Sequence, residues 1–122
     1  MEKQNSKNDL NGKKIILLGG SSGIGLAVAN AAANEGAAVI IVSSNQKRID
    51  EALKQLPENT LGYAVDLSKE QNIKVFFSEM SSFDHLVYTA GENINLGIIN
   101  ETEVDFAKQY FNLRYWGAFT AV

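Results

Sequence analysis

Short apolar runs alternate with helical hydrophobic patterns along most of the chain. Four runs predict strands, at 15–18, 39–42, 61–65 and 85–88. In the first two, apolar residues follow one another without polar alternation, which is typical of strands covered on both faces of a parallel sheet. Since a helical pattern follows each run, we expect an α/β fold. Its sheet is doubly wound, with right-handed crossovers and helices on both faces.

Capping residues mark the ends of the predicted helices. Gly36 ends the first helix, Asn45 caps the second, and Ser68 opens a capping box at the start of the third. Thr102 caps a last helical pattern that runs from Glu103 to about the C-terminus. The face of the first helix that packs on the sheet is expected to hold Ile24, Ala27, Val28, Ala31 and Ala32.

Composition then limits the class of protein. The chain has 122 residues, no cysteine and one histidine, so we expect neither a disulfide framework nor a metal site. A net charge of -3 with scattered basic residues predicts no nucleic-acid partner. Every apolar run is far shorter than the roughly 20 residues of a membrane span. We expect a cytoplasmic protein with no membrane contact, in which a mobile polar leader at 1–12 precedes one domain at 13–122.

A group of glycines stands directly after the first strand and opens the first helix. Gly19, Gly23 and Gly25 have the spacing GxxxGxG. The first allows a tight turn, the second lets backbone N–H groups approach a diphosphate, and the third lets helix and strand pack closely. The helix N-terminus adds unpaired donors and partial positive charge, and Ser21 and Ser22 add hydroxyls. A diphosphate site is predicted here; the alternative is a glycine-rich turn that serves packing alone.

Three motifs resemble those of the short-chain dehydrogenase/reductase family. LGGSSGIG at 18–25 resembles its TGxxxGIG cofactor motif, with Leu18 where Thr is usual. Asp66 matches the acidic residue after its third strand. DHLVYTAG at 84–91 resembles its DxLVNNAG, with Tyr88 and Thr89 replacing two asparagines. The resemblance extends over 9–122. It implies a Rossmann-type sheet, truncated to about four strands in the order 3-2-1-4, that binds a nicotinamide dinucleotide.

The resemblance also assigns roles within the cofactor site. The Asp66 carboxylate accepts a hydrogen bond from the adenine amino group, while the backbone at Leu67 completes the recognition of the same adenine edge. As an alternative, Asp66 only begins the turn or caps the next helix. The stretch 89–91 leaves room for a ribose at the carboxyl end of the fourth strand, where sheets of this class bind ligands.

The end of the second strand bears on the choice between NADP(H) and NAD(H). It reads VSSNQKR at 42–48 and contains no acid that would repel a 2′-phosphate. Ser43, Ser44 and Arg48 would donate to that phosphate; alternatively, Lys47 and Arg48 only form a solvated helix surface. We favour NADP(H). The residues predicted to bind the cofactor are Gly19, Ser21, Ser22, Gly23, Ile24, Gly25, Ser43, Ser44, Arg48, Asp66, Leu67, Thr89, Ala90 and Gly91.

No catalytic residue is assigned in this chain. The family uses a tyrosine with a lysine four residues later, and none of the four tyrosines has a lysine at that distance. Tyr110 has Arg114 there, but both belong to the helix that precedes the family's catalytic position. We therefore expect an incomplete domain that is inactive as a 122-residue chain.

Arg114 falls at the position of a conserved asparagine of the family, three residues before Gly117; Asn112 is the alternative. A turn of 100° per residue predicts that Asn112 faces away from the sheet and Arg114 toward it. Arg114 would then bind a substrate anion or pair with a carboxylate. Its predicted companions on the inward face are Val104, Ala107, Phe111 and Ala118.

The opposite side of this last helix is apolar at Phe106, Tyr110 and Leu113, with Trp116 nearby. Three such residues at helical spacing favour a partner helix, and the family commonly pairs this helix across a dimer. We therefore predict a homo-oligomer that forms through the segment from Glu103 to Val122.

The resemblance as a whole implies the NAD(P)(H)-binding part of an oxidoreductase acting on a carbonyl or secondary alcohol. The alternative is a non-catalytic nucleotide-binding or interaction module derived from that family. A methyltransferase on a similar sheet is disfavoured, because it would need an acid at the end of the second strand for ribose.

Overall fold

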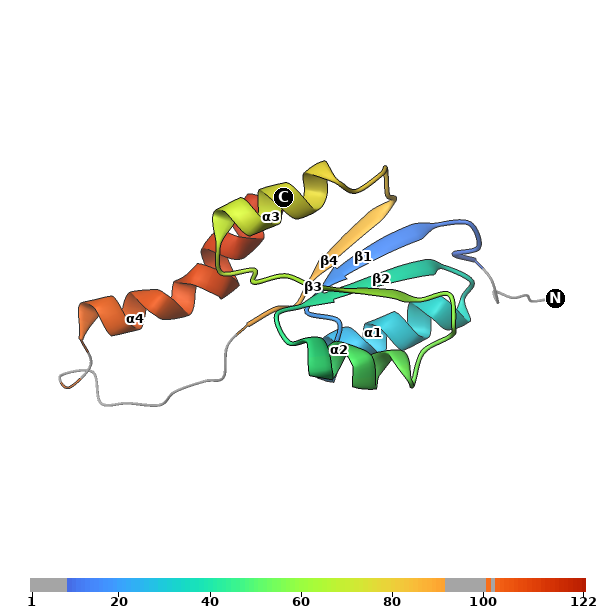
Figure 1. Ribbon diagram of the computed structural model, residues 1–122, viewed down its shortest axis with the longest axis horizontal. Helices are drawn as coiled ribbons and strands as arrows, with labels where there is room; N and C mark the ends of the chain where they lie inside the picture. The colour runs from blue at the N-terminus through green and yellow to red at the C-terminus, as the bar shows by residue number, and fades with distance from the viewer. Residues whose placement is uncertain (1–8, 92–100, 102) are drawn as a thin grey trace.

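A four-stranded parallel sheet forms the centre of the computed structural model, which describes residues 9–91, 101 and 103–122 (Figure 1). Its strand order is β3-β2-β1-β4, and every pair runs parallel. This confirms the predicted fold class and strand order. The strands are β1 (Lys14–Leu18), β2 (Ala38–Ser43), β3 (Leu61–Ala64) and β4 (His85–Tyr88).

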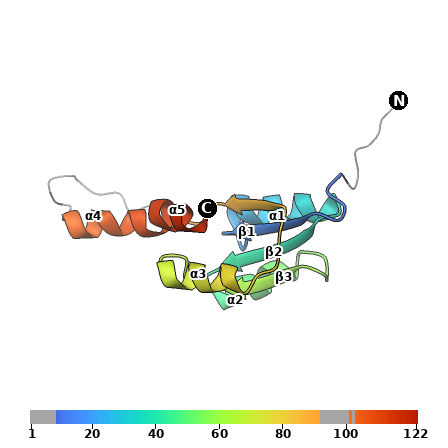
Figure 2. The same ribbon diagram turned by 90° about the horizontal axis from the view of Figure 1, so that it is seen from above.

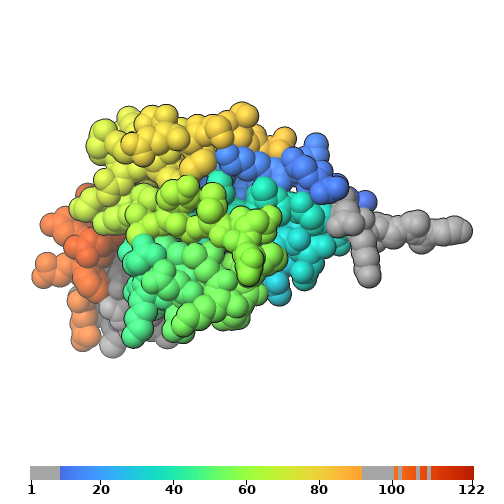
Figure 3. All heavy atoms as spheres, turned by 45° about the vertical axis from the view of Figure 1, so that its right-hand side comes forward, coloured from blue at the N-terminus to red at the C-terminus, as the bar shows by residue number. Residues whose placement is uncertain are grey.

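Helices cover both faces of the sheet (Figures 1 and 2). α1 (Gly23–Asn34) and α2 (Gln46–Leu53) lie on one face, and α3 (Glu70–Ser78) lies on the other. A C-terminal helical run joins α3 there and consists of α4 (Val104–Phe111), the π-helix η2 (Asn112–Gly117) and α5 (Ala118–Ala121). In the space-filling view, α4 lies at one end of the molecule (Figure 3).

Two apolar layers, one on each face, hold the sheet between the helices. Since successive residues of a strand point to opposite faces, Leu17 and Ile41 pack with α1 and α2, whereas Leu18 and Val42 pack with α3 and the C-terminal run. All four side chains are fully buried. Each contributes about 2 kcal/mol through the apolar surface it removes from water.

The inward face of α1 differs from the prediction. Ala32 is buried as predicted, together with Gly25 and Ala29. Ile24, which is 75% exposed, Ala27 and Ala31 instead face outward. The cause is the close approach of α1 to the preceding turn: a Cβ at Gly25 would collide with the carbonyl oxygen of Gly19. This contact rotates the helix relative to its apolar pattern and leaves Ile24 outside the core.

The predicted helix ends are borne out in part. The Asn45 side chain caps α2 by accepting a hydrogen bond from the N–H of Arg48 at 3.0 Å. Gly36 follows α1 with φ +94°, in the left-handed region that suits glycine at a helix end. The capping box at Ser68 is wrong, because Lys69 is the N-cap of α3 and no side chain caps that helix. The predicted cap at residue 102 lies outside the described residues.

The described chain begins shortly before β1, and Leu10 already contacts the domain. Its N–H donates to the carbonyl of Glu35 at 3.1 Å, and its side chain packs on the layer beneath α1 and α2. Residues 1–8 of the predicted leader lie outside the described residues. None of the described helices is both long and apolar enough to span a bilayer.

The C-terminal helical run turns a different face inward from the one predicted. Val104 is 68% exposed and Phe111 54% exposed, although both were expected to face the sheet. Leu113, which was expected to face outward, packs with Ala121 on the layer beneath α3. Gly117, which lies between these two residues in the sequence, is buried. A π-helix has i→i+5 hydrogen bonds and more residues per turn, so each residue of η2 turns by less than the 100° of an α-helix. The prediction assumed an α-helical turn throughout.

Candidate functional site

A cavity of about 330 Å³ opens at the carboxyl ends of the strands. Every residue predicted to bind a cofactor lines it, together with one residue that was not predicted, Leu113. The segments that follow all four strands therefore meet at one place. The lining residues are Gly19, Ser21, Ser22, Gly23, Ile24, Gly25, Ser43, Ser44, Arg48, Asp66, Leu67, Thr89, Ala90, Gly91 and Leu113.

Leu113 was missed because helical spacing placed it on the outer face of the last helix. The sequence carries a signal that would have found it. Leu113, Gly117 and Ala121 are spaced by four, and the last two are small, as expected where a helix packs closely on its neighbours.

The glycine turn is shaped by close backbone contacts. Gly19 has φ +105°, and a Cβ there would stand 2.5 Å from the N of Ala90 and 2.7 Å from Oγ1 of Thr89. Its N–H donates to the carbonyl of Val42 at 2.8 Å. Together with the contact between Gly19 and Gly25, these distances exclude any side chain at either glycine and bring the start of α1 onto the ends of β1 and β4.

The start of α1 offers backbone donors to the cavity. Gly23 has φ +56°, and nothing stands within 4 Å of where its Cβ would be. The N-cap Ser22 makes no side-chain hydrogen bond to the helix. The first N–H groups of a helix have no partner within it, and they carry its partial positive charge. An anionic oxygen can therefore approach this turn without a Cβ in the way.

Asp66 supplies a carboxylate held in one orientation. The Ser68 hydroxyl donates to its Oδ1 at 2.6 Å, and the Ser68 N–H donates to the same oxygen at 3.0 Å. The hydroxyl bond is the largest cause that lowers the pKa of Asp66; the backbone bond and nearby Lys69 add to it, and partial burial opposes it. The carboxylate is thus ionised at neutral pH. Because both bonds end on Oδ1, Oδ2 remains as an acceptor for a ligand.

Ser68→Ala is expected to lower the free energy of unfolding by about 1 kcal/mol at neutral pH, since it removes one hydrogen bond to a charged group. The pKa of Asp66 is lowered in the folded chain, so this contribution is present above the ordinary aspartate pKa of 3.8 and is lost as the pH falls through the lower pKa of the folded chain. The difference from wild type should therefore shrink in acid. Urea denaturation at a series of pH values measures it.

The matched control is Ser78→Ala. The Ser78 hydroxyl donates to the carbonyl of Val75 at 2.7 Å and contacts no carboxylate through that bond. Its effect on unfolding should not change with pH. A pH dependence of equal size in both variants would contradict the role assigned to Ser68.

The end of β2 presents hydroxyls and a guanidinium to the cavity. Ser43, Ser44 and Arg48 all line it, and Asp66 is the only acid among the lining residues that the structure describes. The Asn45 cap fixes the backbone of Arg48 at the start of α2, and the Asn45 N–H donates to the Ser43 hydroxyl at 3.4 Å. This end of the cavity is suited to an anionic group.

The end of β4 is tied to its neighbours by the two residues that depart from the family's asparagines. The Thr89 hydroxyl donates to the carbonyl of Gly19 at 3.2 Å, and the Tyr88 hydroxyl donates to the carbonyl of Leu113 in η2. Asn112 is exposed, as predicted, but so is Arg114, which was expected to face the sheet. The Arg114 guanidinium lies next to Gly91 of the cavity wall. The side chains at 88 and 89 thus hold the turn and the π-helix against the strand.

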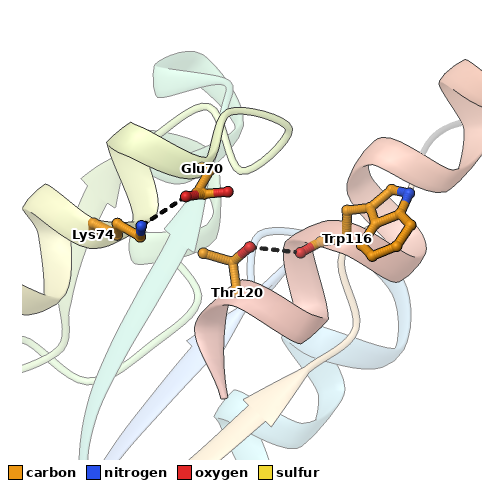
Figure 4. Close-up of polar contacts among 4 residues, drawn as sticks. All are labelled: Glu70, Lys74, Trp116 and Thr120. Carbon is orange, nitrogen blue, oxygen red and sulfur yellow. Dashed lines mark hydrogen bonds and ion pairs between the residues drawn. The ribbon is translucent and has the colours of Figure 1, made fainter.

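A second cavity of about 460 Å³ lies between α3 and the C-terminal run, with Leu67 in the wall of both. Lys74 pairs with Glu70 on α3 at 2.6 Å, and the Thr120 hydroxyl donates to the carbonyl of Trp116 at 2.8 Å (Figure 4). Each of these bonds joins residues of one helical segment. They satisfy polar groups locally and do not converge on a ligand position, so the first cavity is the candidate site.

Comparison with known proteins identifies the family. A sequence model of the short chain dehydrogenases matches residues 13–122. Short-chain dehydrogenase/reductase fsr5 of Gibberella fujikuroi is 33% identical over 122 residues, which cover 88% of this chain and 46% of that protein. Short-chain dehydrogenase/reductase ATR9 of Stachybotrys chlorohalonatus is 39% identical over 95 residues, covering 67% and 38%.

Solved structures show the same architecture. L-Sorbose reductase from Gluconobacter frateurii, solved in complex with NADPH and L-sorbose, is 31% identical with a TM-score of 0.78, and the match covers 92% of this chain and 45% of that one. A short chain dehydrogenase/reductase family protein reaches a TM-score of 0.85 at 26% identity, with coverage of 93% and 48%. The chain spans less than half the length of these relatives.

Proposed function

This chain belongs to the short-chain dehydrogenase/reductase family, and from that premise we propose that it is the dinucleotide-binding part of an oxidoreductase. The reaction is hydride transfer between NADP(H) and a carbonyl or secondary alcohol. The observation that carries the proposal is the cavity of about 330 Å³ at the carboxyl ends of the strands, where the glycine turn, an ionised carboxylate and a guanidinium meet. Ligands of open α/β sheets bind at this edge.

Each part of the cavity fits one part of the dinucleotide. The N–H groups of 21–25 receive the diphosphate at the start of α1. Oδ2 of Asp66 accepts from the adenine amino group, and the backbone of Leu67 completes the adenine edge. The backbone of 89–91 lies where the nicotinamide ribose passes β4. When bound, the nicotinamide ring supplies the hydride chemistry; these residues bind and orient it.

The preference for NADP(H) rests on the end of β2. Arg48, Ser43 and Ser44 line the cavity there without a carboxylate beside them, so a 2′-phosphate meets donors and no repulsion. The related L-sorbose reductase was solved with NADPH.

The 122 residues contain no tyrosine followed by a lysine four positions later. We therefore expect the chain as printed to bind the dinucleotide without turning over ketones. Isothermal titration with NADPH, NADH and S-adenosylmethionine, followed by an assay with NADPH and a panel of ketones, tests both statements. Saturable binding of NADPH without turnover supports them. Tighter binding of S-adenosylmethionine would overturn the assignment, and turnover would overturn the expected inactivity.

We assign the binding domain to residues 13–122 and place the protein in the cytoplasm. The absence of cysteine from the chain agrees with a reducing compartment. The net charge of -3 and the lack of a basic stripe favour a small-molecule ligand over nucleic acid.

A homo-oligomer through the C-terminal run is part of the proposal. Tyr115, Trp116 and Phe119 form a contiguous aromatic patch, with ring centroids 4.6 Å apart for the first pair and 6.1 Å for the second. All three side chains are more than half exposed. Exposed apolar groups that touch one another favour a partner surface, and a second copy of the same helix supplies a matching one.

Phe119→Asp is expected to shift the protein toward monomer, because it places a charge in this aromatic patch. Sedimentation velocity over a range of micromolar concentrations measures the change. Val75→Asp is the matched control: Val75 is exposed on α3, and the same charge there should leave self-association unchanged. A wild-type protein that stays monomeric throughout would contradict the proposed interface.

A further inference from the structure

The turn before β1 contains the one asparagine of the chain that is followed by a glycine, Asn11 before Gly12. The Lys13 N–H donates to the carbonyl of Leu10 at 2.9 Å, which puts Asn11 and Gly12 at the two central positions of a four-residue turn. Gly12 has φ +81°, as the second central position of a type II turn requires. Both central residues are exposed, so water reaches the peptide bond between them.

The fold leaves the polar groups of these two residues unengaged. The Asn11 carboxamide and the Gly12 N–H form no hydrogen bond with any residue that the structure describes. Nothing stands within 4 Å of where a Cβ of Gly12 would be. The Asn11 side chain rests against Gly36, where a Cβ would stand 3.3 Å from both its Cβ and its Oδ1. Because Gly36 has no Cβ, the amide keeps room to turn at this contact.

An asparagine amide beside an unhindered backbone nitrogen can form a cyclic imide. The Gly12 nitrogen gives its proton to hydroxide and attacks Cγ of Asn11. A new C–N bond forms, the bond from Cγ to the side-chain nitrogen breaks, and that nitrogen takes up a proton and leaves as ammonia. Water then opens the imide at either carbonyl, which gives aspartate or isoaspartate without any oxidant or reductant. Glycine favours the attack because it has no side chain to hinder it.

Two other exposed asparagines lack these conditions. Asn34 and Asn59 are followed by Glu35 and Thr60, which carry side chains. The Glu35 N–H donates to two carbonyls of the last turn of α1, at 3.1 and 3.2 Å, and the Thr60 N–H donates to a carbonyl three residues earlier at 3.0 Å. Each attacking nitrogen is thus hindered and already hydrogen-bonded.

We propose that Asn11 and Gly12 form a site of spontaneous covalent modification, at which Asn11 becomes isoaspartate and aspartate before these other asparagines react. Isoaspartate adds a backbone carbon and a negative charge to the turn. The turn is held on both sides, because the Leu10 N–H donates to the carbonyl of Glu35 at 3.1 Å and the carbonyl of Lys13 accepts from β2 at 2.8 Å. The longer backbone changes the bond from Lys13 to Leu10, so the amide signals of both residues should shift.

The experiment incubates the 122-residue chain at mildly alkaline pH in water labelled with heavy oxygen, then digests it and measures peptide masses. We expect the peptide that contains Asn11 to exchange its side-chain NH₂ for a labelled OH and to become a substrate of an isoaspartyl methyltransferase. Peptides that contain Asn34 and Asn59 should stay unchanged over the same period. Since the fold engages neither reacting group, the native chain should convert Asn11 at a rate of the same order as the chain unfolded in urea.

Asn11→Gln is the matched variant, because glutamine keeps the amide but must close a larger ring; its peptide should not convert. The Leu10 and Lys13 amide signals should then shift with time in wild type only. An unlabelled wild-type peptide overturns the inference, and so does equal conversion at Asn34 or Asn59. Conversion that proceeds only in urea also overturns it, because the fold then protects the site.

Discussion

Gly25→Ala is expected to destabilise the fold by about 3 kcal/mol, the upper end of what overpacking a tight contact costs. Helix propensity alone predicts the opposite sign, because alanine is better than glycine inside a helix by about 1 kcal/mol. The packing effect dominates here, since the new Cβ meets the backbone carbonyl of Gly19, which cannot move aside as a flexible side chain would. Urea denaturation measures the change.

The matched control is Asn30→Ala. Asn30 is exposed on the same helix, so the substitution gains helix propensity without a new contact, and stability should rise slightly or stay within about 0.5 kcal/mol. A Gly25→Ala protein as stable as Asn30→Ala would show that α1 does not press on the glycine turn, and the geometry of the diphosphate site would need revision.

Ser44→Asp is expected to weaken NADPH binding on the order of 100-fold while leaving NADH binding within about threefold, because the new carboxylate opposes the 2′-phosphate that only NADPH carries. Ser44 lines the cavity beside Arg48 at the end of β2. Isothermal titration of both dinucleotides into wild type and variant gives the ratio of the two affinities.

Asn59→Asp adds the same charge at an exposed position before β3, outside the cavity. It should change neither affinity beyond the effect of net charge. If Ser44→Asp weakens NADPH and NADH equally, the end of β2 does not contact the 2′-phosphate, and the preference for NADP(H) loses its basis.

The hydrophobic pattern predicted the sheet well because its central strands are buried on both faces. Ile15 to Leu18 and Val39 to Val42 have no polar residue among them, and such runs leave few alternatives to a parallel sheet. The wrong predictions concern helix rotation. Ile24 was placed inward by its hydrophobicity, but the backbone contact at Gly25 decides how α1 sits on the sheet.

The composition of the cavity was predicted more completely than its geometry. Motifs after each strand named the lining residues, because the carboxyl ends of parallel strands meet at one edge whatever the details of packing. Leu113 was missed and Arg114 was given the wrong companions, because both depend on the π-helix. The spacing of four from Leu113 to Ala121 marks the buried face, but a pattern at 100° per residue does not report the π-helical turn. The hydroxyl of Tyr88 that binds this segment acts across 25 residues of sequence.

The most direct test of the central claim is a titration of the ¹⁵N-labelled chain with NADPH, followed through the backbone amide signals. Binding of the diphosphate at the glycine turn predicts the largest shifts at residues 21–25, since those N–H groups lie at the start of α1. Shifts confined to the second cavity, between α3 and the C-terminal run, or no saturable shift at all, would contradict it.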